Sequence, residues 1–561
     1  MDQPKTIDSV TTLFRDIPSY SIEKIPHIQA LSVDFLTDDL ELAFQIREQC
    51  AWKDSIPFRV FRDYILPYSI YEEPLVQWRS IFHQKYAPLI EGVDSPKQAF
   101  DIVYAHIKEN FTLGEVKFPL TKDPLMIDRL QKGLCHERSL YITAVMRSLH
   151  IPVAYDFSTT WANYGRDVFG HAWVAYVGKN AREIYTMFDF NDTVSYKTGY
   201  IPGSTFLRTV DFDDTATDYH IENQKKIAKV WRHTYAGSKE PDAFVQAEDV
   251  SSLYGFQGEL FVVREGKKAE DLVLCVFETG GGWIPVEQMP AVKRKKTVFT
   301  CLGQDITYLP AVRQFGELTP VSNPVTVYGK GGQIIRDPDY ERTETVILRR
   351  KYPLMSLWAP LRWQDCIGLS FHASNDRFLH HDTIHLVSRM PLGITYTEVN
   401  PDTVYRYVRM RQRRGKRESF TEMAFYGTDE QGEEVELTGE IIYWGMDSTQ
   451  AARYFDGDFY AGGLSKDHFA WVGLDLGEGN TRQITKIMYC PRNDGNMIIP
   501  GDEYELFFYD MGWHSLGKQV AHKEWLNFGE VPANAVLWLR NLSAGHEERI
   551  FTYENGKQKF W

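Results

Sequence analysis

Cysteine is scarce in this sequence. The chain has 561 residues and 6 cysteines, at Cys50, Cys135, Cys275, Cys301, Cys366 and Cys490. None lies close enough to another to form a CxxC zinc or redox motif, and six in so long a chain are too few for a disulfide framework. The open question is therefore whether one of them is a single reactive thiol.

Excess positive charge and long apolar runs are also absent. The formal net charge of -14 argues against a general nucleic-acid binder or a protein of anionic membrane surfaces. No run reaches the ~18 apolar residues of a membrane span, and the stretch Met1–Lys5 does not begin a secretory signal. We therefore expect a soluble chain with no transmembrane segment and no nucleic-acid partner, although a signal or lipid anchor removed beforehand would leave no trace. Nucleotide chemistry has no support either, because neither GxGxxG nor a P-loop lysine motif occurs.

What is present indicates a globular protein of several domains. The composition is 43% hydrophobic and 25% charged, which excludes a disordered or fibrous chain. The first ~130 residues have helical periodicity. Thr37-Asp38-Asp39 predicts one helix start, and Ser95-Pro96 predicts another. Three strand-like runs follow the helical stripe after Cys135, at Val153–Phe157, His171–Val177 and Ile184–Phe188.

From about residue 245 the helical period gives way to short strands and glycine-rich turns, which are typical of β-sandwiches. We therefore predict a multidomain α+β protein. Its expected parts are a helical N-terminal region over 1–120, a papain-like core over 121–244, a β-sandwich over 245–350 and a second β-sandwich over 351–561.

One set of residues can carry chemistry. Cys135 stands where a helix should begin, and the positive end of a helix favours thiolate over thiol. His171 opens a predicted strand, and Asp189 closes the next. A histidine can take the thiol proton, and a carboxylate can fix the orientation of that histidine. Each residue alone could be structural, but the order Cys, His, Asp on helix, strand and strand favours a triad of papain type.

These residues lie in motifs that resemble the core of the transglutaminase-like superfamily. The motifs are Gly133–Ser139, Arg147–Val153, Gly170-His171-Ala172-Trp173 and Phe188-Asp189. The resemblance implies that Cys135 is the nucleophile, His171 the base and Asp189 the residue that orients His171, with Asp192 as the reserve candidate.

The match is not complete, and some roles stay open. His150 stands where the family pattern has a glycine in a turn. Trp161 precedes His171 as in bacterial members, and it could line the acyl groove or pack beneath the site. The backbone N–H of Cys135 could stabilise the oxyanion, together with Gln131 or Trp161. Gln131 could equally be a solvated residue.

The last ~210 residues resemble a discoidin (coagulation factor 5/8 C-type) β-sandwich. The segments that carry this resemblance are Tyr405–Arg409, Met423–Gly427, Phe455–Asp458 and Val472–Gly477. The family commonly binds glycans or cell surfaces, so the resemblance implies a possible glycan ligand. The whole order of modules resembles that of Bacteroides-type multidomain proteins, which are commonly envelope-associated.

Three further features of this region each have two interpretations. Asp456 and Asp458 could help to bind Ca²⁺, or could form an ordinary turn around Gly457. The tryptophans could stack on sugars or fill the core. The basic run Arg406–Arg417 could meet an anionic glycan or phosphate, or could be an outer strand face paired with Glu418 and Glu422.

Together these observations predict a cysteine peptidase or amidase of the transglutaminase-like kind. Cys135 would attack a peptide or side-chain amide of a peptide or glycopeptide substrate through a thioester, with no cofactor required. We prefer hydrolysis to crosslinking because water is always present. The alternative is a non-catalytic carbohydrate- or protein-binding protein with a vestigial triad.

Overall fold

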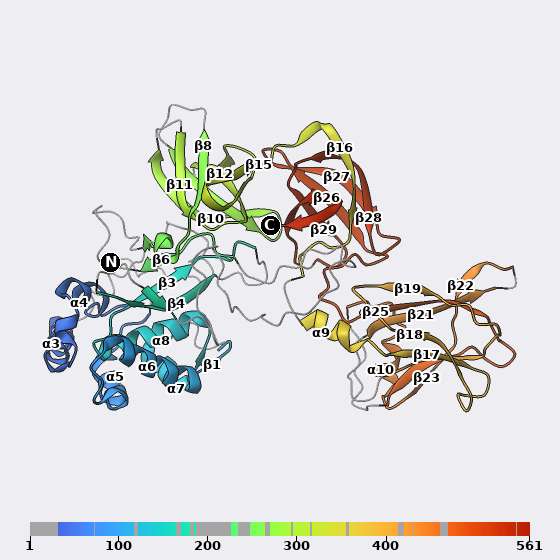
Figure 1. The fold of residues 1–561 in the computed structure, drawn as a ribbon, viewed down its shortest axis with the longest axis horizontal. Coiled ribbons are helices and arrows are strands. Elements are labelled where there is room, and N and C mark those ends of the chain that lie inside the picture. Colours follow the sequence, from blue (N-terminus) through green and yellow to red (C-terminus); the bar gives the residue numbers. More distant parts are fainter. Residues whose placement is uncertain are drawn as a thin grey trace.

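The computed structural model describes most of the chain. The described residues are 32–71, 73–116, 122–163, 170–179, 184–186, 226–233, 247–263, 270–292, 296–314, 317–354, 358–412, 420–429, 431–460, 469–545 and 547–561. They form a mixed α+β structure, with most helices early in the chain and antiparallel, sandwich-like sheets over the rest (Figure 1). The predicted combination of helices and β-sandwich-like sheets is confirmed at this level.

Helices dominate residues 32–148. Their bounds are α3 Val33–Gln49, η1 Lys53–Ser55, α4 Phe58–Tyr64, α5 Arg79–Tyr86, η2 Ala87–Ile90, α6 Pro96–Asn110, α7 Pro124–Leu130 and α8 Cys135–Ser148. The side chain of Ser95 caps α6 and Pro96 takes its first position, as the spacing predicts. The predicted start of α3 was wrong, although the helix itself is present. That helix begins at Val33, before the expected start at Thr37, because the Ser32 hydroxyl already accepts a backbone N–H of the first turn.

An antiparallel sheet packs against α8. Its order is β5-β4-β3-β6-β7, with β3 at Val153–Ser158, β4 at His171–Val177, β5 at Ile184–Thr186, β6 at Trp231–His233 and β7 at Ala247–Asp249. A short parallel pair, β1 Thr112–Leu113 and β2 Lys132–Gly133, precedes α8. The helices and this sheet share one hydrophobic core, which extends from Ala43 to Trp231. The core therefore crosses the expected division at residue 120.

The middle of the chain is a β-sandwich. Its strands are β8 Gly258–Val263, β9 Glu270–Glu278, β10 Gly282–Val292, β11 Lys296–Leu302, β12 Ile306–Gln314, β13 Glu317–Pro320, β14 Val325–Val327 and β15 Gln333–Ile335. A larger sheet in the order β10-β9-β12-β14-β15, with β13 beside β12, faces the pair β11-β8 across a buried core. The short 3-10 helix η3, Ser251–Tyr254, leads into this sandwich from β7.

A second sandwich is built from two distant segments of the chain. Strand β16, Asp339–Leu348, pairs with β28, Leu526–Ala533. They cover a sheet in the order β27-β26-β29-β30-β31, with β26 Glu503–Tyr509, β27 Trp513–Val520, β29 Leu537–Asn541, β30 Ile550–Glu554 and β31 Lys557–Phe560. β16 lies before the expected division at residue 350, whereas its partner lies after it.

The chain between β16 and β26 forms a separate sandwich, hereafter the inserted module (Figure 1). Its strands are β17 Ser370–Ser374, β18 Asp382–Leu386, β19 Thr395–Glu398, β20 Tyr407–Arg411, β21 Phe420–Thr428, β22 Glu434–Glu436, β23 Glu440–Trp444, β24 Trp471–Asp475 and β25 Ile484–Pro491, with helices α9 Trp358–Asp365 and α10 Ser448–Ala452. Sheets β18-β17-β20-β24-β23 and β19-β25-β21-β22 enclose the core of the module. This antiparallel two-sheet form agrees with the predicted β-sandwich.

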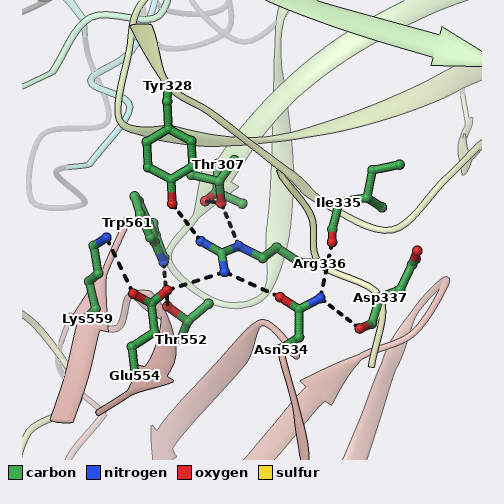
Figure 2. A network of polar contacts seen from close by, with 11 residues as sticks. Thr307, Tyr328, Ile335, Arg336, Asp337, Asn534, Thr552, Glu554, Lys559 and Trp561 are labelled. Carbon is green, nitrogen blue, oxygen red and sulfur yellow. Dashed lines mark hydrogen bonds and ion pairs between the residues drawn. The ribbon is translucent and has the colours of Figure 1, made fainter. Parts of the chain in front are cut away.

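Arg336 joins the middle sandwich to the sandwich that contains β16 and β28. It is 4% exposed, and its guanidinium donates to Thr326 Oγ1 at 2.9 Å and to Tyr328 OH at 3.0 Å. Across the interface it pairs with Glu554 at 3.3 Å and lies over the ring of Trp561 (Figure 2). A shared cluster of buried apolar side chains extends this contact. The two sandwiches are therefore packed together rather than merely linked.

Helix α8 is followed by a buried left-handed turn at His150. This residue has a φ of 58°, which glycine adopts more readily than other residues. Its carbonyl accepts a hydrogen bond from Trp52 Nε1 at 2.9 Å, and its ring packs on Phe61 with 5.3 Å between the centroids. Burial, reinforced by the cations of Arg47 and Arg79, lowers the pKa of His150 to about 3.

We expect the stability of this core to fall below pH 6.5, and His150→Gly to remove part of that fall. In the unfolded chain His150 binds a proton at its ordinary pKa of 6.5, whereas in the folded chain it stays neutral until the pH approaches its lowered pKa. The stabilising contribution is therefore present above pH 6.5 and is lost as the pH falls toward the folded value. The loss should reach about 2 kcal/mol near pH 5. Hydrogen exchange of the α8 amides at two pH values measures it, and an unchanged pH dependence in the variant would contradict the assignment.

Candidate active site

The start of helix α8 positions Cys135. Cys135 is the first helical residue, and the Glu137 carboxylate accepts the backbone N–H of Leu134 at 2.9 Å. Lys122 Nζ pairs with the same carboxylate at 3.0 Å. Burial opposes the Glu137 anion, but His136 and Lys122 outweigh burial and lower the pKa of Glu137. The thiol therefore stands at a well-fixed helix N-terminus, where the free N–H groups favour negative charge.

The start of strand β4 positions His171. Its ring stacks with two tryptophans, with centroid distances of 5.3 Å to Trp161 and 5.9 Å to Trp173. Gly170 comes immediately before it, and a Cβ at that position would lie 1.7 Å from the carbonyl oxygen of Ser158. Glycine is thus required where β4 meets the end of β3. Close packing against β3 thus explains the glycine of the motif Gly170-His171-Ala172-Trp173, and the histidine of the motif packs on aromatic rings.

A hydrogen bond ties these two elements together beside the candidate residues. Ser139 Oγ, one helical turn after Cys135, donates to the carbonyl of Ala172, next to His171, at 3.0 Å. Residues four apart in a helix share a face, so Cys135 and Ser139 lie on the same side of α8. The contact brings the start of α8 to the end of β4 at which His171 lies.

The predicted carboxylates lie outside the described residues. Both Asp189 and Asp192 follow strand β5, which is described only over Ile184–Thr186. β5 is antiparallel to β4, with Ile184 opposite Val177 and Thr186 opposite Ala175. The strand therefore runs back toward the end of the sheet at which His171 lies. The assignment of Asp189 stays a prediction.

Gln131 and Trp161 have different surroundings. Gln131 ends helix α7 in a left-handed conformation, with a φ of 45°. Its side-chain amide donates to the Asp128 carbonyl at 2.6 Å and to the Tyr141 hydroxyl at 3.3 Å. Trp161, in contrast, is buried and stacks directly on His171. Trp161 therefore lies against His171, whereas Gln131 takes part in the contact between α7 and α8.

A buried polar network behind the site was missed from the sequence. Arg232 binds Asp156 through two hydrogen bonds of 2.7 and 2.8 Å. The Tyr254 hydroxyl donates to Asp156 at 2.6 Å and accepts from Trp173 Nε1 at 2.7 Å. Burial disfavours the Arg232 cation, but Asp156 outweighs it and raises the pKa of Arg232. A charged residue inside the apolar run Val153–Phe157 was the signal that could have revealed a buried pair.

This network fixes the tryptophan that packs on His171. Asp156 lies on β3, Arg232 on β6 and Tyr254 in η3, so three elements converge on Trp173 of β4. Burial, followed by the charge of Asp156, raises the pKa of Tyr254 well above its ordinary value. The hydroxyl therefore stays a hydrogen-bond donor at neutral pH.

The other cysteines have less suitable surroundings for a nucleophile. Burial raises the pKa of Cys50 to about 11 and that of Cys490 to about 12, and it also raises the pKa of Cys275. Cys366 is buried. Cys301 is partly buried and packs against the cluster that contains Trp161 and Trp173, but it lies on strand β11. Of the six thiols, that of Cys135 alone combines partial burial with a position at a helix N-terminus.

Asp456 and Asp458 form a tight turn in the inserted module. Asp456 accepts the backbone N–H of Asp458 at 3.0 Å, and Asp458 accepts that of Tyr460 at 2.8 Å. Gly457 between them has a φ of 77°. Within the described ranges, no three His, Cys, Asp or Glu side chains are grouped as metal ligands. These hydrogen bonds support the interpretation of Asp456 and Asp458 as an ordinary turn around Gly457.

Comparison with known proteins gives no assignment. No family model matches the sequence, and no curated protein matches it.

Across the part of the chain that the structure describes, no helix combines the length and apolar character needed to cross a membrane.

We expect Gly170→Ala to destabilise the core and to displace His171. The added Cβ would meet backbone atoms of Ser158 and Thr159, which cannot move aside as a flexible side chain could. The cost should be at least about 2 kcal/mol, measured by urea unfolding. Gly512→Ala is the matched control, because no atom lies within 4 Å of its added Cβ. Equal stability of the two variants would contradict the role of Gly170.

Proposed function

We propose that the protein is a transglutaminase-like cysteine hydrolase acting on peptide or side-chain amide bonds. The observation that carries the proposal is the hydrogen bond from Ser139 Oγ to the Ala172 carbonyl. It ties the helix turn that begins with Cys135 to the strand that begins with His171. A nucleophile and a base must lie together in this way for acyl transfer.

The reaction would proceed through a thioester. His171 takes the proton of the Cys135 thiol as the sulfur attacks the carbonyl carbon of the amide. The tetrahedral intermediate collapses, the C–N bond breaks, and His171 returns its proton to the leaving amine. Water then attacks the thioester carbonyl while His171 again accepts a proton. The C–S bond breaks, the carboxylic acid product leaves, and the proton returns from His171 to the Cys135 sulfur. Asp189 would orient His171 throughout.

Several described contacts support this assignment of roles. The rings of Trp161 and Trp173 hold the imidazole of His171 in one plane. The positive end of α8, where Cys135 is the first helical residue, is suited to stabilise negative charge on the attacked oxygen. The buried pair of Asp156 and Arg232 secures Trp173 through Tyr254. A pre-organised arrangement of this kind reduces the reorganisation required during the reaction.

The substrate would be a peptide or glycopeptide, and the β-domains would hold the enzyme at a glycan or protein surface. An amine attacking the same thioester would give an isopeptide crosslink instead. We favour hydrolysis, because no described feature forms a second site for an amine. An envelope location agrees with this proposal and rests on the resemblance alone.

We expect Cys135→Ser to abolish amide hydrolysis while the fold is retained. Removing the nucleophile of a catalytic triad typically lowers turnover by several orders of magnitude, so a loss of at least about 100-fold is expected. Two assays cover both kinds of amide. Release of new amines from an acetylated peptide mixture reports peptide-bond cleavage, and release of ammonia from glutamine-containing peptides reports side-chain hydrolysis.

Cys301→Ser is the matched control, because Cys301 is also partly exposed and packs against the cluster that contains Trp161 and Trp173. It should retain the activity of the unmodified chain. Incorporation of a fluorescent primary amine into the peptides, in place of hydrolysis, would redirect the proposal to transamidation. Hydrolysis that is equal in the Cys135→Ser variant and the unmodified chain would refute a Cys135 nucleophile.

A further inference from the structure

The outer face of one sheet of the inserted module carries an unusual set of side chains. Alternate residues of β17, β20 and β24, such as Phe371, Met410 and Val472, point into the module core. Their neighbours must therefore face outward. The outward residues align across the strands in three rows, which the pairing register defines; the row of Ser374, Tyr407, Asp475 and Glu440 lies at one end, and Asp475 there binds Arg406. The next row is His372, Arg409, Gly473 and Ile442, and the third is Ser370, Arg411, Trp471 and Trp444.

Two arginines at the centre of this face have no carboxylate partner among the described residues. The only hydrogen bond of Arg409 to a described residue runs from Nε to His372 Nδ1, at 3.3 Å, and its guanidinium lies over the rings of Phe378 and Trp471. Arg411 is exposed, and no described carboxylate pairs with it. The sequence predicts Glu418 and Glu422 as partners of this basic run. Glu418 lies outside the described residues, and Glu422 accepts the backbone N–H of Gly457 at 2.9 Å.

Arg406, another residue of the same basic run, differs from Arg409 and Arg411 because it has a carboxylate partner. Arg406 makes two hydrogen bonds to Asp475, of 2.6 and 2.9 Å. Its charge is therefore satisfied inside the module, and it is not available to a ligand. No carboxylate in the described ranges neutralises the charge of Arg409 or Arg411 in this way. Burial, and next the charge of Arg411, lowers the pKa of Arg409 to about 10, so Arg409 remains cationic at neutral pH.

Aromatic rings flank these cations. Trp444 is 50% exposed, which is high for so large an apolar side chain. It lies opposite Trp471 on the adjacent strand. Because neighbouring strands are about 4.8 Å apart, Arg411 on β20 and Trp444 on β23 are separated by about 10 Å across β24. That span exceeds a single sugar ring and suits a short stretch of a polymer.

We propose that this outer face, formed by Arg409, Arg411, Trp444 and Trp471, binds an anionic polysaccharide. The exposed guanidinium of Arg411 would pair with its carboxylate or sulfate groups, since Arg presents a planar fork of donors that suits such anions. Arg409 is only 8% exposed and would add positive charge beside Trp471. The tryptophan rings would stack on the apolar faces of its sugar rings. The inference deepens the proposed function, because it specifies where and to what the hydrolase would attach. A nucleic acid is the less favoured polyanion, because nucleic-acid sites typically neutralise about 6–10 phosphates, whereas the three rows of this face carry two arginines.

Binding of the full chain to three immobilised polymers tests the proposal. Polygalacturonate presents only carboxylates, dextran sulfate presents only sulfates, and plain dextran presents neither. We expect binding to one or both anionic polymers, a decrease as salt is added, and no binding to dextran. Arg411→Gln should weaken binding at least about tenfold, which corresponds to the loss of a charge-assisted hydrogen bond. Trp444→Ala should also weaken it. Both side chains are exposed, so melting temperatures should not change.

Arg453→Gln is the matched control, since Arg453 is an exposed cation of the same module at the end of α10. It should bind as the unmodified chain does. Binding is also measured with Cys135→Ala, so that the result does not depend on catalysis and a failure of either proposal is recognised separately. The proposal is overturned if neither anionic polymer binds, if the Arg411 and Trp444 variants bind normally, or if single-stranded DNA binds more tightly than both polysaccharides.

Discussion

The packing of helix α8 on strand β4 is the contact on which the candidate site depends. The hydrogen bond from Ser139 to Ala172 closes that contact at the end where Cys135 and His171 lie. It is buried within a core that the N-terminal helices and the sheet share, so the position of Cys135 is secured by the whole helical region. Reactive geometry of this kind requires rigid support, because a small displacement of a nucleophile costs a large factor in rate.

The local elements of the core could be predicted, since their signals lie close together in the sequence. The strand expected at Val153–Phe157 is β3, and the strand expected at His171–Val177 is β4. Ser95 and Pro96 marked the start of α6 for the same reason. The start of α3 was missed because two capping residues, Ser32 and Thr37, compete over a short distance, and the first of them makes the cap.

Long-range contacts could not be predicted, because nothing in a local pattern names the partner. The pairing of β16 with β28 and the ion pair of Asp156 with Arg232 both join residues far apart in the chain. The same holds for Arg336, whose partners come from two sandwiches. For the candidate site, the sequence motifs indicated Cys135 and His171, whereas the support from Tyr254 and Asp156 became apparent only in three dimensions.

The rate at which Cys135 is alkylated by iodoacetamide at mildly acidic pH tests the central claim most directly. Mass spectrometry follows each of the six thiols in the unmodified chain and in His171→Ala. If His171 activates Cys135, this thiol reacts first in the unmodified chain, ahead of the part-exposed Cys301, and His171→Ala slows its reaction at least about tenfold. Equal, slow labelling of Cys135 and Cys301 in both proteins would contradict the account.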